Sequence, residues 1–373
     1  MLALTMTRLT RILACGACAL TLASCSLFPA KNAALVRGIR LPLDEDVRFK
    51  TDDDIVGGLQ VREKNVYFAT RKGSVYAFDG DAAKLLWTVP GTRTAASALA
   101  AGPDRLAFAD ADEAIHCLTL DGRELWKSAV QARRLTEVVL ASPGVLVVAD
   151  EDLIIALDAD GGAEAWRFKA GAAIQTSLAI WNARIVFGTG DGKIRMIDFQ
   201  GRAVKGAGET GLARGGPLSI EGNRLFLGLT GGVFRCVDPL NFKPHWTVKT
   251  GDFPVSAPVA DEKRIYVVTA NDVLYAINKR NGNLDWWRML PARTPFSPVA
   301  GEEQIFLASP KTSALTVLDK STGSHAGSYD LGAEIRSAPA LIGGRILVSV
   351  YHPDTAEGAL VFLKGAPEPA AKQ

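Results

Sequence analysis

Residues 256–286 read SAPVADEKRIYVVTANDVLYAINKRNGNLDW, and this stretch decides the fold. Short runs rich in Val, Ile and Tyr occupy positions 256–259, 264–269, 273–278 and 284–286. They are separated by polar turns at 261–263, 270–272 and 279–282. The pattern is typical of short antiparallel strands joined by tight turns. Because one such unit cannot bury both of its faces, we expect it to recur along the chain.

The unit recurs with a period of about 40 residues. Five of the seven tryptophans occupy one position of the repeat, namely Trp87, Trp126, Trp166, Trp246 and Trp286. A mostly basic column precedes the second strand, at Asn65, Arg105, Arg184, Arg224, Arg264, Gln304 and Arg345. A third column closes the third strand, at Asp79, Asp158, Asp198, Asp238, Asn278 and Asp319. The unit between Glu137 and Trp166 lacks the arginine but keeps the strands.

A repeat of about 40 residues with four short strands is typical of one blade of a β-propeller. The predicted blades open near Gly58, Ser97, Val138, Thr176, Gly216, Ser256, Phe296 and Ser337. The sequence therefore predicts an all-β fold, an eight-bladed β-propeller of four-stranded antiparallel blades. We expect each column tryptophan to pack between neighbouring blades, where an indole buries on the order of 200 Å².

The last repeat stops at Leu360-Val361-Phe362-Leu363 without a fourth strand. Residues 47–51 precede the first repeat and resemble the fourth strands that begin at Trp166 and Trp246. We therefore expect the N-terminal strand to complete the last blade and close the ring. Closure would leave only short outer strand edges exposed.

The two chain ends flank the predicted propeller of residues 44–364. Residues 1–24 carry Arg8 and Arg11 before an apolar stretch that is too short to span about 30 Å of hydrocarbon, so we interpret them as a signal peptide. Leu22-Ala23-Ser24-Cys25 resembles the bacterial lipobox, which predicts lipidation at Cys25; an ordinary signal peptide with a chance cysteine is the alternative. Residues 25–43 would then form a tether, and residues 365–373 a flexible tail. The residue after Cys25 is Ser26 rather than Asp, and this resembles the pattern of lipoproteins that are sorted to the outer membrane.

Composition and motifs narrow the classes of function. The apolar fraction of 48% and the net charge of +2 favour neither disorder nor a nucleic-acid-binding surface. The four histidines follow no ligand spacing, and the chain has no zinc-protease, phosphate-loop or Gly-x-Ser-x-Gly motif. Most aspartates occupy turns. Cys117 and Cys236 are predicted in third strands three blades apart, as small core residues that cannot bridge.

The repeat resembles the PQQ-enzyme-like repeat family in its Ser-Ala-Pro opening, its Leu-Tyr-Ala-Ile-Asn strand and its Gly-x-x-x-Trp close. One branch of that family comprises quinoprotein dehydrogenases, which hold pyrroloquinoline quinone and Ca²⁺ over the propeller axis. Those enzymes are longer, and the alcohol-oxidising ones carry a vicinal Cys-Cys pair that this sequence lacks. The other branch is the BamB-type lipoprotein of the outer-membrane barrel-assembly machinery. It has eight blades, a lipobox and no cofactor, and the likeness to it runs from the signal peptide to the last strand.

The BamB-type resemblance implies a non-enzymatic scaffold that is lipid-anchored at the periplasmic face of the outer membrane, with no cofactor and no metal. It implies binding to the periplasmic POTRA domains of BamA, with other Bam lipoproteins and unfolded outer-membrane protein precursors as further partners. The family contact uses a Leu-x-Leu-Arg-Gly segment, which reads Gly211-Leu212-Ala213-Arg214-Gly215 here. An Asp-x-Asp loop follows one blade later, where this chain keeps only Asp252. The predicted partner-binding residues are thus Leu212, Arg214 and Asp252.

Two other classes of function remain open from the sequence. A periplasmic chaperone could bind unfolded barrel precursors by adding a strand to a blade edge. A PQQ-dependent dehydrogenase relative would require convergent polar groups on the propeller axis. These readings differ from the scaffold in the partner or ligand that co-purifies.

Overall fold

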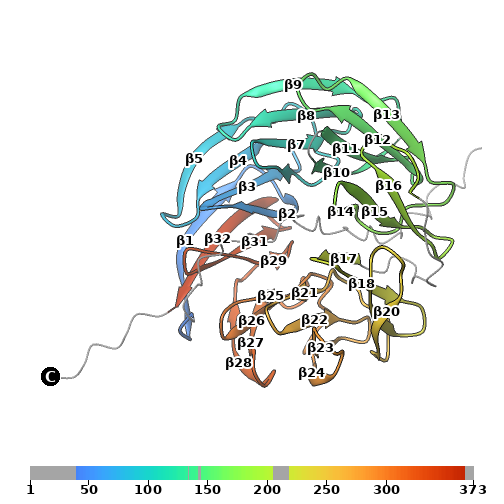
Figure 1. Cartoon of the computed structure of the whole chain (residues 1–373). Helices are drawn as coiled ribbons and strands as arrows, with labels where there is room; N and C mark the ends of the chain where they lie inside the picture. The colour runs from blue at the N-terminus through green and yellow to red at the C-terminus, as the bar shows by residue number, and fades with distance from the viewer. Residues whose placement is uncertain (1–38, 133, 142–143, 205–217, 366–373) are drawn as a thin grey trace, which may run out of the picture.

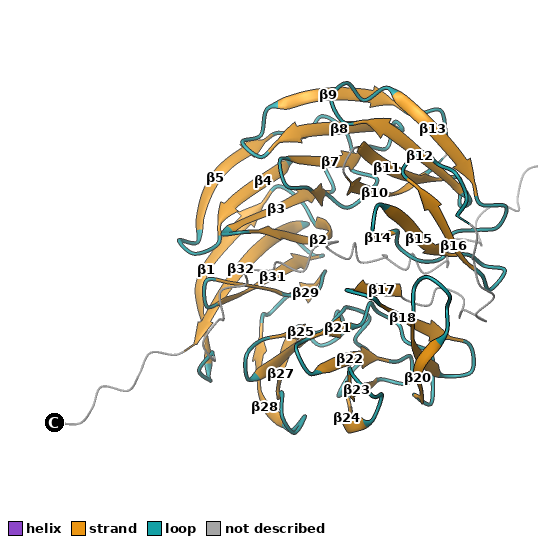
Figure 2. Cartoon of the chain, in the orientation of Figure 1, coloured by secondary structure: helices purple, strands orange, loops and turns teal. Residues whose placement is uncertain are grey.

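The computed structural model describes residues 39–365 apart from 133, 142–143 and 205–217. Every regular element in that part of the chain is a β-strand, as Figure 2 shows. The strands form antiparallel sheets arranged around a ring, with the first strands near the middle and the fourth strands on the rim (Figure 1). The prediction of an eight-bladed β-propeller is confirmed.

The first four blades follow the chain order. Blade 1 contains β2 (Ile55–Arg62), β3 (Asn65–Thr70), β4 (Val75–Asp79) and β5 (Lys84–Val89). Blade 2 contains β6 (Ala100–Ala101), β7 (Arg105–Ala109), β8 (Ala114–Thr119) and β9 (Glu124–Ala129). Blade 3 contains β10 (Leu135–Ala141), β11 (Gly144–Ala149), β12 (Leu153–Asp158) and β13 (Glu164–Lys169). Blade 4 contains β14 (Ala179–Trp181), β15 (Arg184–Gly188) and β16 (Ile194–Asp198), and a single bridge joins Ile197 to Ala203.

The remaining blades repeat the pattern. Blade 5 contains β17 (Leu218–Glu221), β18 (Arg224–Leu229), β19 (Val233–Val237) and β20 (Pro244–Lys249). Blade 6 contains β21 (Val259–Ala260), β22 (Arg264–Val268), β23 (Val273–Asn278) and β24 (Leu284–Met289). Blade 7 contains β25 (Val299–Ala300), β26 (Gln304–Ala308), β27 (Ala314–Asp319) and β28 (His325–Asp330). Blade 8 contains β29 (Glu334–Ile335), β30 (Ala340–Ile342), β31 (Arg345–His352), β32 (Glu357–Gly365) and β1 (Leu43–Thr51).

The ring closes through the N-terminal strand, as the sequence predicts. β1 pairs antiparallel with β32, and Val47 lies opposite Phe362 in the register. Arg345 in β31 pairs with Asp46 at 2.9 Å and also donates to the carbonyl of Asp81 in blade 1. Packing reaches back to Ile39, which is buried in the cluster between blades 7 and 8. The seam is therefore fastened by a strand, an ion pair and apolar contacts together.

The hydrophobic core is divided into layers that each lie between two neighbouring blades. The layer of blades 6 and 7, for example, contains Tyr266, Leu274 and Trp286 from one blade and Ile305 and Leu307 from the next. This arrangement follows from the sequence because both faces of a blade's middle strands are apolar. Each blade must then bury one face against each neighbour. The stability of the ring is thus set by its inter-blade contacts.

The column tryptophans dock across these layers, which confirms the predicted packing. The indole N–H of Trp126 donates to the carbonyl of Ala159 at 2.8 Å, in the next blade. Trp87, Trp166, Trp246 and Trp286 make the same contact with Leu120, Phe199, Lys279 and Lys320. A glycine of the next blade lies against each ring. At Gly162, whose φ is +69°, an added Cβ would come within 2.4 Å of the Trp126 indole, so only glycine allows so close an approach.

The aspartate column and the two cysteines have the predicted structural roles. Asp158 closes its third strand by accepting hydrogen bonds on Oδ1 from the N–H groups of Asp160 and Gly161, at 3.0 and 2.9 Å. Cys117 and Cys236 are free and buried, in β8 and β19. Burial raises the pKa of the Cys117 thiol to about 11, so this thiol is inert at neutral pH.

Candidate functional site

Only one of the four site residues predicted from the sequence belongs to the part of the chain that the structure describes. Cys25, Leu212 and Arg214 lie outside the described residues. Asp252 lies in the connection from β20 of blade 5 to β21 of blade 6. Its surroundings therefore define the part of the predicted partner surface that can be examined.

Hydrogen bonds fix the conformation of the loop that contains Asp252. The buried Thr250 hydroxyl donates to the carbonyls of Gly232 at 3.1 Å and of Asp252 at 2.9 Å. Gly251 has a φ of +72°, which sets the turn. The N–H of Phe253 donates to Asp252 Oδ1 at 2.8 Å, and no basic side chain in the described ranges pairs with this carboxylate. The carboxylate is thus oriented by the backbone and accessible to a partner.

Phe253 is a surface residue that the sequence reasoning missed. Its side chain is 40% exposed, and it directly follows Asp252 in the chain. Aromatic residues of this kind act as anchors at protein interfaces. The apolar residue inside a Gly-Asp-Phe-Pro loop was the available signal. Asp252 and Phe253 together form an acidic and aromatic patch.

Antiparallel pairing gives the ring two faces. We call the face with the blade-to-blade connections and the second-to-third-strand turns the lead-in face; in blade 6 it comprises residues 251–258 and 270–272. The opposite turn face carries the first-to-second and third-to-fourth turns, residues 261–263 and 279–283 in blade 6. Asp252 lies on the lead-in face. β1 begins on the turn face, because Leu43 pairs with Gly365 at the end of blade 8 where Arg345 pairs with Lys364.

On the turn face, the basic column of the sequence has a function that spacing alone did not reveal. Arg264 Nη1 donates to the carbonyl of Lys320 at 3.3 Å, which is the same oxygen that accepts the Trp286 indole N–H at 3.2 Å. Arg224 and Trp246 share the Lys279 carbonyl in the same way, at 3.1 Å each. Each such arginine and tryptophan pair therefore fastens its blade to one carbonyl of the next blade.

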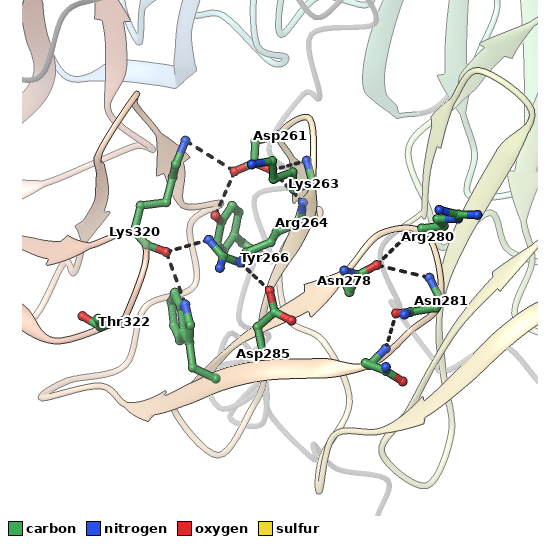
Figure 3. Close-up of polar contacts among 12 residues, drawn as sticks. Asp261, Lys263, Arg264, Tyr266, Asn278, Arg280, Asn281, Asp285, Lys320 and Thr322 are labelled. Carbon is green, nitrogen blue, oxygen red and sulfur yellow. Dashed lines mark hydrogen bonds and ion pairs between the residues drawn. The ribbon is translucent and has the colours of Figure 1, made fainter.

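Asp261 organises the turn face around blade 6, as Figure 3 shows. Its Oδ1 accepts from the N–H groups of Lys263 at 2.8 Å and Arg264 at 2.6 Å, and its Oδ2 accepts from the Tyr266 hydroxyl at 2.9 Å. Lys320 of blade 7 lies 3.4 Å from the same Oδ2. Burial acts to raise the pKa of Asp261, but the backbone N–H groups, Tyr266 and Lys320 outweigh it and lower that pKa.

A groove of about 460 Å³ adjoins this cluster. It is lined by Arg224, Glu262, Lys263, Arg264, Asn278, Lys279, Arg280 and Asp285. Arg264 Nε donates to Asp285 at 2.6 Å, and Lys279 Nζ pairs with Glu221 at 2.9 Å. The volume is within the usual range of small-molecule sites, but the lining is strongly polar.

Ionisable groups are also buried at two other places, one in blade 3 and one in blade 2. Glu137 in β10 accepts a hydrogen bond from the N–H of Leu178 in blade 4 at 3.3 Å, and burial raises its pKa to about 7. In blade 2, Asp110 Oδ2 lies 2.8 Å from His116 Nε2 and 3.3 Å from Lys127 Nζ. Burial acts to raise the pKa of Asp110, but His116, the N–H of Ala114 and Lys127 lower it overall.

The side chains described in the structure offer no ready metal centre. No group of three or more His, Cys, Asp or Glu residues within the described ranges is arranged to hold a metal ion. The cluster that comes nearest in composition, Asp110 with His116 and Glu124, already contains Lys127 as a fixed cation. Across residues 39–365, apart from their gaps, no helix could span a membrane.

Comparisons with known proteins place the chain in a family. A family model described as outer membrane protein assembly factor BamB matches residues 111–205 and 202–352. The search of curated proteins returns no match. Among solved structures, BamB from Moraxella catarrhalis matches with a TM-score of 0.73 and 14% identity over 88% of this chain and 100% of that one.

Other propellers are similar in fold. The quinohemoprotein alcohol dehydrogenase from Comamonas testosteroni matches with a TM-score of 0.66 and 13% identity, over 93% of this chain and 80% of that chain. The computationally designed Ika8 protein matches with a TM-score of 0.66 and 14% identity, over 85% and 98% of the two chains. At such identities a solved structure supports the fold alone, so the choice between a scaffold and an enzyme depends on the family match.

Proposed function

The chain belongs to the BamB family of outer membrane protein assembly factors, and from this membership we propose that it is a non-enzymatic scaffold of the machinery that assembles outer-membrane β-barrels. The observation that carries the proposal is the family match across residues 111–352. Its partner would be the POTRA domains of BamA, with other Bam lipoproteins and unfolded barrel precursors nearby in the same assembly.

The lead-in face of blades 5 and 6 is the proposed contact surface. Asp252 supplies an oriented carboxylate, and Phe253 beside it supplies an exposed aromatic ring. Leu212 and Arg214 precede the first strand of blade 5 at nearly the same phase of the repeat. Aromatic and arginine side chains are enriched at interface hot spots, where their truncation commonly costs about 2 kcal/mol or more. A patch with an acid, a base and apolar groups can therefore discriminate its partner by charge as well as by shape.

Membrane attachment is proposed to be covalent, through acyl chains on Cys25, with the propeller on the periplasmic side of the outer membrane. The support is the lipobox-like Leu22-Ala23-Ser24-Cys25 together with the family. More than one acyl chain gives stable anchoring where a single chain is marginal. Residues 1–24 would be the signal peptide, residues 25–43 a tether and residues 365–373 a tail, with the propeller at 44–364.

Co-purification from detergent-solubilised outer membranes tests the proposed function. The wild-type chain is expected to capture the barrel-inserting partner with its POTRA domains. Cys25→Ser should leave the chain folded and able to bind those domains in solution, while releasing it from membranes when partners are absent. A wild-type chain that captures no barrel-assembly component would contradict the scaffold assignment.

Strand addition is a second candidate function, favoured by one observation. The outer strand β24 exposes Leu284, Trp287 and Met289, with Trp287 51% and Met289 67% exposed. Long apolar side chains on an outer strand favour pairing with another extended chain. Crosslinking of unfolded barrel precursors to β24 in the absence of BamA would support this candidate, whereas precursor capture only with BamA present would favour the scaffold alone.

A further inference from the structure

The groove on the turn face of blade 6 has an excess of positive charge that the described residues do not neutralise. Of its five basic lining residues, Arg264 is paired with Asp285, and Lys279 is paired with Glu221. Arg224 donates to the backbone carbonyls of Lys279 and Arg280 and to the sulfur of Cys236, none of which carries a full charge. The remaining lining residues supply more cations than anions.

Lys263 and Arg280 are the cations that face the groove without an acceptor. Neither side chain has a hydrogen-bond or ion-pair partner within the described ranges, and both are exposed. Of the two lining carboxylates, Asp285 is paired with Arg264, and Glu262 has no ion-pair partner among the residues that the structure describes. Outside the two ion pairs, the groove therefore holds three cations, Arg224, Lys263 and Arg280, and one anion, Glu262. Its net charge is positive. Cations held close together repel one another unless an anion lies between them.

The backbone that carries these two cations is fixed in advance. Asp261 Oδ1 accepts the N–H of Lys263 at 2.8 Å, and Asn278 Oδ1 accepts the N–H of Arg280 at 3.1 Å. The two turns precede β22 and follow β23, and they lie at the same end of this strand pair, where Arg264 is opposite Asn278; Figure 3 shows both turns. A ligand that binds both side chains would order the side chains but not the loops, so the entropic cost of binding is small.

We propose that this groove is an oxyanion site that binds a phosphate group between Arg280, Lys263 and Arg224. A guanidinium matches phosphate oxygens through two parallel N–H donors, and an ammonium adds a point charge. A doubly charged phosphate balances the excess charge of the groove, while a single carboxylate does not. The volume of about 460 Å³ holds a phosphate together with the group that it esterifies.

The phosphate could belong to a lipid headgroup or be free in solution. The lipid source is supported by the position of β1, which starts on the turn face and so connects that face to the N-terminal segment. Residues 25–38 could extend about 45 Å, enough to let the turn face meet a bilayer. Only this lipid arm rests on the proposed anchor at Cys25; binding of free phosphate is independent of the proposed function.

The test compares two charge-matched double variants of the full chain, each also carrying Cys25→Ser so that no acyl chain contributes. Lys263→Gln with Arg280→Gln removes the groove cations. Lys84→Gln with Lys243→Gln removes two exposed cations at third-to-fourth-strand turns of blades 1 and 5, on the same face. Calorimetric titration with inorganic phosphate forms one arm, and co-sedimentation with phosphatidylglycerol vesicles forms the other. Thermal unfolding curves verify that both variants fold.

The groove variant is expected to lose about tenfold or more in phosphate affinity, since it loses two charge-assisted contacts, while the control variant keeps it. Loss of vesicle binding in the groove variant alone identifies a lipid source, and phosphate binding without vesicle binding identifies a free one. Equal affinities for the two variants, or no phosphate binding by the wild-type groove, would overturn the site. So would tighter binding at the groove of a synthetic Asp- and Glu-rich peptide than of phosphate.

Discussion

Two inter-blade interfaces, that of blades 6 and 7 and that of blades 3 and 4, contain the same tryptophan contact. They differ in whether an arginine also binds the carbonyl that the indole binds. In the first, Trp286 and Arg264 donate to one carbonyl, that of Lys320. In the second, Trp166 donates alone to the carbonyl of Phe199 at 2.8 Å, and Gly144 stands in the arginine column. The repeat thus supplies the indole at both places, but the guanidinium at only one.

The missing guanidinium leaves a cavity. A space of about 400 Å³ lies over Trp166 and is lined by Ala141, Gly144, Leu146, Ala156, Leu157, Asp158, Ala165, Trp166, Phe199 and Gln200. The arginine cannot simply be restored there. A Cβ added at Gly144 would lie 2.5 Å from the carbonyl oxygen of Leu157, so β11 itself would have to move. The space over Trp166 therefore lies where other blades place an arginine side chain, and the backbone around Gly144 does not admit a side chain.

The same interface of blades 3 and 4 carries the buried Glu137. Strand register places it level with Ala98, Ser177 and Ala257, the small residues that follow the start of other blades. Its carboxyl reaches the N–H of Leu178 in the next blade. A buried carboxyl with a pKa of about 7 destabilises the folded state once it ionises. We therefore expect blades 3 and 4 to form the weaker of the two interfaces.

Removing the tryptophan side chains should have the largest effect on stability and should differ between the two interfaces. Trp286→Ala is expected to lower the free energy of unfolding by about 3–5 kcal/mol, because a buried ring and its hydrogen bond are lost from a closed interface. Trp166→Ala should cost roughly 1–2 kcal/mol less, since one side of that ring already faces a cavity. Urea unfolding followed by fluorescence measures both. Equal losses would contradict the difference between the interfaces.

Glu137→Gln should remove a pH-dependent weakness of the second interface. The folded carboxyl keeps its proton up to a pKa of about 7, while the unfolded one loses it near 4.5. The folded state therefore has its full free energy of unfolding below pH 4.5, where this carboxyl is protonated in both states. That contribution is lost as the pH rises through 7. The glutamine is neutral throughout and still accepts from Leu178. At pH 8 the variant should be more stable than the wild type by about 3 kcal/mol.

Unfolding curves at pH 4 and pH 8 check the expectation for Glu137→Gln. The difference between variant and wild type should be near zero at the lower pH, where both the folded and the unfolded carboxyl are largely protonated, and appear at the higher one. Asp110→Asn, at a carboxylate whose pKa is lowered, is the opposite case and should destabilise at pH 8. A wild-type stability that rises between pH 5 and pH 7 and is flattened by Glu137→Gln would contradict the sign of the shift.

Arg264→Gln gives the smallest of the three effects. The substitution removes the contact with the Lys320 carbonyl and the ion pair with Asp285, both of which are partly exposed. A loss of about 1–2 kcal/mol is expected, mainly from the hydrogen bond to the carbonyl. Arg280→Gln, at a neighbouring arginine without a side-chain partner among the described residues, should change stability by less than about 0.5 kcal/mol. A silent Arg264→Gln would mean that the basic column does not fasten the blades.

Much of the fold could be predicted from the sequence because each repeat shows the same pattern of strands and turns. The tryptophan column at 87, 126, 166, 246 and 286 predicted the inter-blade packing, and the strand at Val47 predicted the closure of the ring. Both follow from apolar periodicity, which is local. The glycines that lie against the indoles, such as Gly162 and Gly282, follow each tryptophan at a nearly constant distance and could have been found in the same way.

The contacts across blades could not be predicted because they depend on how two blades stack. The arginine column is visible in the sequence, but its carbonyl acceptor is not, since it lies 54 to 56 residues away on the next blade. Glu137 was hidden for a similar reason, because only strand register shows that it replaces a small residue. Of the proposed partner surface, the sequence indicated Asp252 through the family motif and overlooked Phe253.

The central claim, that the lead-in face of blades 5 and 6 binds the POTRA domains of BamA, is tested most directly by titrating purified POTRA domains against the chain. Arg214→Glu is expected to weaken binding by roughly thirtyfold or more while leaving the unfolding curve unchanged. Arg93→Glu is the matched control, because Arg93 lies at nearly the same phase of the repeat, in the connection that leads into blade 2, and its partner among the described residues is Asp112, in a surface ion pair at 2.8 Å. It should bind like the wild type. Equal affinities for the Arg214 and Arg93 variants would contradict the claim.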